Sequence, residues 1–152
     1  MSTDIPVRPS AGRSSELLLD PRVHGRSRVP GPKTTGFHLG TFAAALEDRD
    51  IGYQSSRYAL DADVRIVDPD NPPSAPQTVH GRPAIHAWLL HARTRDLDLH
   101  VTRLIDGGNR VAFTELWHHR DGTAVVATST AEIEAGLIIR RHTVLVWDHD
   151  PR

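Results

Sequence analysis

The sequence predicts an α+β protein in which helices come first and a curved, mainly antiparallel sheet follows. Apolar residues recur at helical spacing early in the chain, from Phe37 to Leu46. Long apolar and β-branched runs then fill residues 97–147, separated by short connections that contain Gly. Because the helices are collected ahead of this meander, the sheet is expected to curve around them.

Three helices are expected. The first covers residues 41–50, where Phe42 and Leu46 belong to the apolar stripe. A second, short helix is expected over residues 51–60, with Tyr53 and Tyr58 near its inner side. The third opens at Gly81-Arg82-Pro83, since proline is tolerated in a first helical turn, and it runs to Arg93 with Trp88 on its apolar stripe.

Five strands are expected. The first is short, covering residues 64–68, and Pro69 ends it before a proline-rich loop over residues 70–76. The other four form the meander. Their expected ranges are residues 97–105, 111–119, 123–134 and 137–147.

Composition narrows the function classes. The 152 residues suit one ordinary domain, and 18 basic against 19 acidic side chains give no excess charge for binding nucleic acid. No stretch is long enough to span a bilayer, and the first residues lack a secretory signal, so a cytoplasmic location is expected. The chain has no Cys, no metal-ligand spacing among its His residues and no Gly-rich phosphate loop, so neither metal nor cofactor is expected.

The first 36 residues differ in composition from the rest. They contain five Pro, four Gly, five Ser and no aromatic residue, so they cannot bury enough surface to offset the entropy lost on ordering. We expect a disordered or loosely docked tail over residues 1–36 and one folded domain over residues 37–152.

Strand alternation points to Glu115 as a chemically interesting residue. It shares one face of its strand with Phe113, Trp117 and His119. A carboxyl between two aromatic residues either pairs with a base such as Arg103, faces a polar cavity, or becomes neutral as its pKa rises.

Two further groups are candidates for proton transfer. Asp68 ends a strand ahead of Pro69, where it serves either as a general base or as a turn residue that caps the following loop. His142 shares a strand face with Val144 and is either an acid or base in a pocket or a structural histidine. The candidate catalytic residues are Asp68, Glu115, His119 and His142. The candidate substrate contacts are Phe42, Tyr53, Tyr58, Trp88, Phe113, Trp117, Thr128, Glu132 and Val144.

Six segments carry a family resemblance. In chain order they are FAAALEDRD, ALDADVRIVDP, HGRPAI, IDGGNRVAF, RDGTAVV and IEAGLIIRRHTVLVWD. Together they resemble the SnoaL-like domain of the nuclear transport factor 2-like superfamily over residues 37–148. The resemblance implies a cone-shaped fold, a strongly curved sheet on three helices around an apolar pocket, and a homodimer packed through the sheet. Members include ketosteroid isomerase, polyketide cyclases, epoxide hydrolases and noncatalytic binders.

The resemblance carries over only in part to individual residues. Asp68-Pro69 is similar to the isomerase's catalytic Asp before a Pro, but Phe42 stands where the isomerase has its oxyanion-hole Tyr. Arg140-Arg141-His142 stands at the cyclase motif, and no Asp follows before Asp148. No Arg with paired Asp residues matches the epoxide hydrolases.

The leading hypothesis is therefore a small-molecule enzyme of bacterial secondary metabolism, such as antibiotic biosynthesis. It would isomerise or cyclise a small apolar or polyketide-like ligand with Asp68 as the general base. One alternative is a noncatalytic protein of the same fold that binds an apolar ligand or acts as a dimeric adaptor. Another is epoxide opening, in which Asp68 shares a water with Glu115 or Glu132.

Overall fold

The computed structural model describes residues 36–148, so the tail expected over residues 1–36 lies outside them except for Gly36. Two helices come first, α3 (Leu39–Glu47) and α4 (Ile51–Ser56). After β1 (Tyr58–Val67) and β2 (Gln77–His80), helix α5 (Arg82–Arg93) follows. The remaining elements are β3 (Leu97–Asp106), β4 (Arg110–His119), β5 (Ala124–Glu134) and β6 (Leu137–Asp148).

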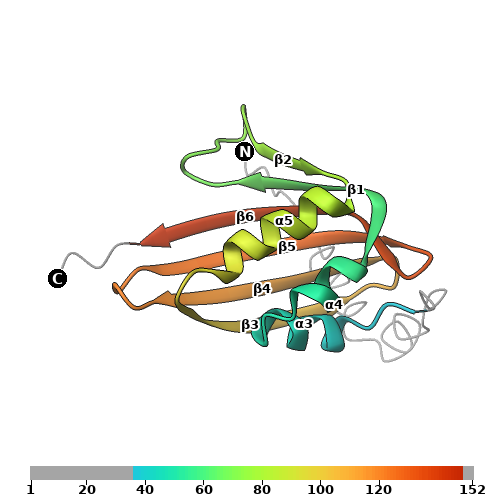
Figure 1. The fold of residues 1–152 in the computed structure, drawn as a ribbon, viewed down its shortest axis with the longest axis horizontal. Helices are drawn as coiled ribbons and strands as arrows, with labels where there is room; N and C mark the ends of the chain where they lie inside the picture. Colours follow the sequence, from blue (N-terminus) through green and yellow to red (C-terminus); the bar gives the residue numbers. More distant parts are fainter. Residues whose placement is uncertain (1–35, 149–152) are drawn as a thin grey trace, which may run out of the picture. The chain divides into compact units, whose positions relative to one another are not determined.

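The six strands form one mixed sheet in the order β2-β1-β6-β5-β4-β3. All neighbours are antiparallel except β1 and β6, which are parallel. The helices pack against one face of this sheet (Figure 1). The α+β class and the order of the meander are thus confirmed, with the three helices on the inner face.

The second helix is shorter than expected. It ends at Ser56, and Tyr58 already belongs to β1. Two long-range hydrogen bonds hold this change of direction: Ile138 N donates to Arg57 O at 2.7 Å, and Arg82 Nε donates to Tyr58 O at 2.8 Å. Tertiary pairing therefore overrides the local helical pattern at residues 57–60.

Strand β2 is an element that the sequence did not indicate. It pairs antiparallel with β1 at the edge of the sheet, and none of its four residues is buried. A short exposed edge strand shows no alternation of apolar and polar residues. The sequence pattern therefore did not predict a strand at these residues. Gly81 connects it to α5 with φ of +85°, a backbone conformation that favours glycine.

The core lies between the helices and the sheet. Phe42 of α3 packs edge-on against Tyr58 of β1 and Phe113 of β4, with ring centroids 6.4 and 5.8 Å apart. From α5, Ile85 and Leu89 are buried against the same cluster. Strand β4 alternates as expected, so Phe113 and Glu115 both point inward.

Candidate functional site

A partly enclosed cavity of about 70 Å³ lies between the helices and the inner face of the sheet. Helices α3, α4 and α5 contribute to its wall, together with strands β3, β4 and β6. Most of this wall is apolar. The aliphatic lining residues are Leu46, Ile51, Leu89, Ala92, Leu97, Leu99 and Leu145.

The polar centre of the cavity is the ion pair between Arg141 of β6 and Glu115 of β4. Nη2 of Arg141 donates to Oε2 of Glu115 at 3.1 Å, and the two side chains are only 3% and 4% exposed. Nη1 donates to the hydroxyl of Tyr58 at 3.0 Å. Nε donates to the hydroxyls of Thr143 at 3.1 Å and Ser129 at 3.2 Å. Every nitrogen of the guanidinium therefore has a partner.

Small side chains on β5 make this pairing possible, because β5 separates β4 from β6. Glu115 lies opposite Ala127, and Arg141 lies opposite Ala131. Between these alanines stands Ser129, whose hydroxyl is also within 2.8 Å of that of Thr143. The side chains on the inner face of β5 are thus small enough for the long Arg141 side chain to cross over them and reach Glu115.

Burial and the ion pair shift the pKa of Glu115 in opposite directions. Burial raises the pKa of its carboxyl above the usual glutamate range, and the charge and hydrogen bond of Arg141 offset this only in part. For Arg141, burial lowers the pKa, but Tyr58 and Glu115 together outweigh it, so the guanidinium remains charged. The Cζ atom of Arg141 also lies 5.1 Å from the ring centroid of Phe113 and 5.8 Å from that of Trp88, which gives two cation–π contacts.

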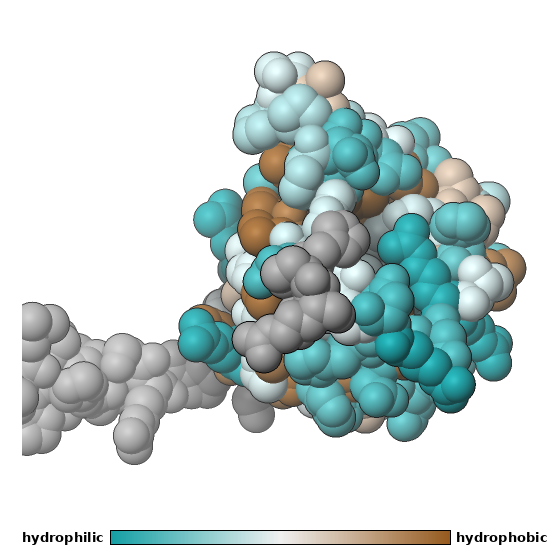
Figure 2. All heavy atoms as spheres, turned by 90° about the vertical axis from the view of Figure 1, so that its left-hand side faces the viewer, coloured by the Kyte–Doolittle hydropathy of each residue, from teal (hydrophilic) through white to brown (hydrophobic). Residues whose placement is uncertain are grey.

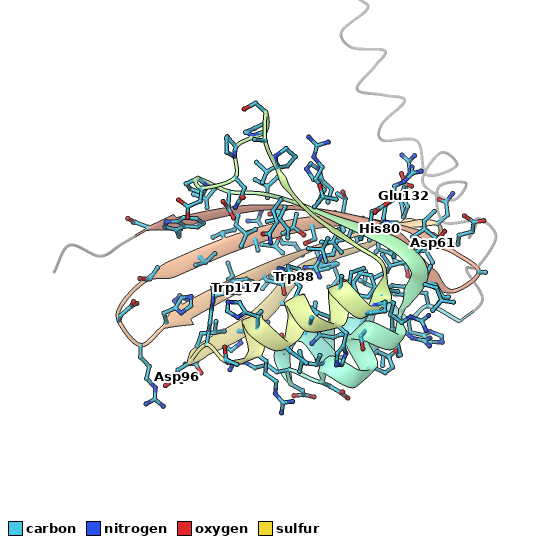
Figure 3. All side chains as sticks on the ribbon, turned by 45° about the horizontal axis from the view of Figure 1, so that its top comes forward. Asp61, His80, Trp88, Asp96, Trp117 and Glu132 are labelled. Carbon is cyan, nitrogen blue, oxygen red and sulfur yellow. The ribbon has the colours of Figure 1, made fainter. Side chains whose placement is uncertain are left out.

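Two tryptophans complete the cavity wall. Trp88 of α5 and Trp117 of β4 both line it, and both lie between α5 and the sheet in Figure 3. Nε1 of Trp117 is buried, and no residue in the range 36–148 accepts its hydrogen. Glu115, Trp88 and Trp117 are thus the three predicted site residues that line this cavity.

Several predicted contacts lie in the core beside the cavity and are not part of its wall. Phe42 and Phe113 are buried in the aromatic cluster, and Tyr58 reaches the site only through its bond to Arg141. Tyr53 of α4 is half-buried, with the guanidinium of Arg57 5.6 Å from its ring centroid.

Asp68 and His119 lie together in a second, more open depression at the end of the sheet. Oδ1 of Asp68 accepts from the backbone N of Asp70 at 2.9 Å and of Asn71 at 2.7 Å, and from Nδ2 of Asn71 at 3.0 Å. Asp68 therefore caps the loop after β1, which is the second of its two predicted roles. Figure 2 faces this end and shows hydrophobic side chains among polar ones. Trp117 lines both this depression and the cavity.

Four predicted site residues lie on the outer face of the sheet, away from the cavity. Arg141 and Thr143 point inward, so strand alternation turns their neighbours His142 and Val144 outward. On β5, the exposed residue Thr128 and the half-buried Glu132 also face outward, and Glu132 accepts a hydrogen bond from Arg140 at 3.3 Å. Asp68, Glu115 and Glu132 thus line three separate hollows, so the structure does not bring together the carboxylate pair that epoxide opening requires.

Sequence analysis missed Arg141, the residue that organises the site. The expected partner of Glu115, Arg103, lies instead in an irregular part of β3 with φ of +54°, and it is exposed. Two features of the sequence could have indicated Arg141. Strand alternation in β6 places it on the same face as Thr143, and β5 has small residues at alternate positions.

Residues 36–148 contain no group of three or more His, Asp or Glu side chains that could hold a metal ion. Within the same range, no helix is both long and apolar enough to cross a membrane.

One family model matches most of the chain, and several solved structures share its fold. The family model described as a SnoaL-like domain matches residues 39–141. A proposed ketosteroid isomerase from Kribbella flavida is 21% identical, covering 75% of this chain and 79% of its own, with a TM-score of 0.59. An NTF2-like protein of unknown function from Mesorhizobium loti is 15% identical, covering 71% and 87%, with a TM-score of 0.61. A proposed polyketide cyclase from Sinorhizobium meliloti is 20% identical, covering 69% and 91%, with a TM-score of 0.55. At such identities these structures show a shared fold, and no curated protein matches the chain.

Proposed function

Because the chain belongs to the SnoaL-like domain family, we propose that it is a small-molecule isomerase or cyclase that moves a proton beside a carbonyl group held in the cavity. The observation that carries this proposal is the buried Glu115 carboxyl, which lines an apolar cavity next to the charged guanidinium of Arg141. Perturbed carboxyl groups in such clefts are typical of acid-base catalysis.

Glu115 is the proton acceptor in this mechanism. Its raised pKa makes the carboxylate a stronger base than an exposed glutamate. It removes a proton from the carbon next to the ligand's carbonyl, and the electron pair moves onto the carbonyl oxygen. Arg141 supplies the positive charge that favours this oxyanion inside a largely apolar cavity.

The intermediate then has two outcomes. In an isomerisation, Glu115 returns the same proton to another carbon of the conjugated system. In a cyclisation, the enolate carbon attacks a second carbonyl of the same ligand, and the proton goes to the new alkoxide. Both outcomes share the first step, which therefore serves as the test.

The cavity volume limits how much of a ligand can be enclosed. At 10–15 Å³ for each water, about 70 Å³ holds roughly five to seven waters, so about one ring of a ligand fits inside. We propose a small cyclic compound or one end of a polyketide-like chain as the ligand, and a role in bacterial secondary metabolism such as antibiotic biosynthesis as its setting.

The test is exchange of the α-protons of cyclohexanone for deuterium in D₂O, followed by proton NMR. The protein should accelerate exchange, and the rate should fall as the pH drops through the raised pKa of Glu115, because only the carboxylate accepts a proton. Glu115→Gln should lower the rate about a hundredfold. Glu134→Gln is the matched control, since Glu134 is exposed at the end of β5 and should leave the rate unchanged.

Asp68→Asn separates this proposal from the hypothesis that Asp68 is the base. A rate that falls with Asp68→Asn and survives Glu115→Gln would assign the base to Asp68 instead. If cyclohexanone shifts the indole NMR signals without any exchange, the noncatalytic binder is the better account.

A homodimer through the outer face is part of the same proposal. Three valines on neighbouring strands are exposed there: Val126 at 45%, Val144 at 42% and Val146 at 63%. Val126 lies opposite Val146, so the valines form a continuous patch of the kind that a second copy covers. Sedimentation velocity should show a dimer that Val146→Asp converts to monomer; a monomeric wild type would contradict the proposal.

A further inference from the structure

Two arginines line the cavity where it meets the solvent. Arg49, which follows α3, is half-buried, and Arg93, at the end of α5, is exposed. By contrast, Glu115 and Arg141 are buried. The cavity therefore runs from a buried ion pair at its inner end to two cationic side chains at its outer end.

Arg49 occupies this place at a conformational cost. Its φ is +54°, and its backbone N donates to Leu46 O at 3.2 Å, so it closes α3 in the left-handed conformation usually taken by glycine. Its Nη1 donates to the carbonyl of Arg95 at 3.0 Å, which anchors the side chain to the connection between α5 and β3. Only one of its five N–H groups is used in this bond.

Neither Arg49 nor Arg93 forms an ion pair with an acidic side chain among residues 36–148, and most of the acidic residues nearby have other partners. Glu47 accepts a hydrogen bond from Val101 N at 2.8 Å, and Asp50 accepts one from Tyr53 N at 3.0 Å. Asp96 pairs with Arg120 at 2.8 Å, and Asp48 is exposed and pairs with neither lining arginine. Among residues 36–148, neither lining arginine thus forms an ion pair with these carboxylates, and both guanidinium groups can pair with an anionic ligand.

We propose that the ligand carries a carboxylate, which binds to Arg49 and Arg93 while its apolar ring fills the cavity. This inference rests on the proposed function only for the carbonyl that faces Glu115. The carboxylate belongs at the outer end because at the inner end it would lie beside the negative charge of Glu115. Guanidinium groups also match the planar geometry of a carboxylate.

The experiment compares 3-phenylpropanoate with 3-phenylpropanamide, which have the same shape and differ in charge. Dissociation constants come from NMR titration of the indole signals at low salt. The wild type should bind the acid at least about tenfold more tightly than the amide, and added salt should narrow this gap. Arg49→Gln and Arg93→Gln should each reduce the preference several-fold, whereas Arg110→Gln, on the outer face, should not.

The Arg93→Gln variant should fold like the wild type, because Arg93 is exposed. A change in its binding preference therefore reports on the ligand and not on loss of structure. Equal affinity for acid and amide, or no binding of either, would overturn the proposal. Glu115→Gln separates the two proposals: it should lower the rate of α-proton exchange about a hundredfold and retain the preference for the acid. A clearly stronger preference for the acid in this variant would place the carboxylate at the inner end instead, because the substitution removes the negative charge beside Arg141.

Discussion

Arg141→Met removes the positive partner of a carboxylate that is almost wholly buried. The substitution deletes four hydrogen bonds, to Glu115, Tyr58, Ser129 and Thr143. Breaking one side of a buried ion pair costs about 3–5 kcal/mol, because the other charge is left without compensation. Since a domain of this size has about 5–15 kcal/mol of stability, we expect the variant to lose a large part of it.

The loss should depend on pH. Burial raises the pKa of Glu115 and Arg141 opposes that rise, so without Arg141 the folded-state pKa lies further above the unfolded-state value. A folded state that holds its proton more tightly is stabilised at low pH, and this stability is lost as the pH rises through the folded-state pKa, by at most about 1.4 kcal/mol per pH unit. The variant should therefore be less destabilised at about pH 5 than at about pH 8.

Urea unfolding followed by tryptophan fluorescence measures these losses. The double variant Arg141→Met/Glu115→Leu supplies the control, because replacing both charges by apolar groups removes the uncompensated one. It should lie within about 2 kcal/mol of the wild type, although Glu115→Leu alone is as damaging as Arg141→Met. Two single losses that simply add in the double variant, or a loss below about 1 kcal/mol for Arg141→Met, would refute the reasoning.

Two smaller predictions concern the backbone. Asp68→Ala removes the acceptor that caps the loop after β1 and should cost about 1 kcal/mol in thermal unfolding without changing α-proton exchange; unchanged stability would contradict the capping role, and lost exchange would assign the base to Asp68. Gly81→Ala should cost about 1–3 kcal/mol because of its φ of +85°, although its new Cβ would meet nothing closer than Leu60 O at 3.6 Å. The control Gly40→Ala, in α3 with open space around it, should stabilise by up to about 1 kcal/mol, and equal effects at the two glycines would argue against backbone strain.

Much of the architecture could be predicted because it depends on local periodicity. Alternation along β4 placed Glu115 on the inner face with Phe113, and the apolar stripe of the third helix placed Trp88 there. The same reasoning failed at Tyr58, where pairing with distant residues replaced a helix by a strand. It also did not predict β2, because none of the four residues of β2 is buried and they show no alternation of apolar and polar side chains.

Sequence alone therefore determined the α+β class, the strand order of the meander and the presence of an inward-facing carboxyl. Only the tertiary structure decided which group meets that carboxyl, because Arg141 reaches Glu115 across a third strand and the register of β4, β5 and β6 sets this contact. It also turned His142 outward and placed the Asp68 carboxylate against its own loop. Periodicity identifies the face on which a side chain lies, whereas its partner depends on how distant strands align.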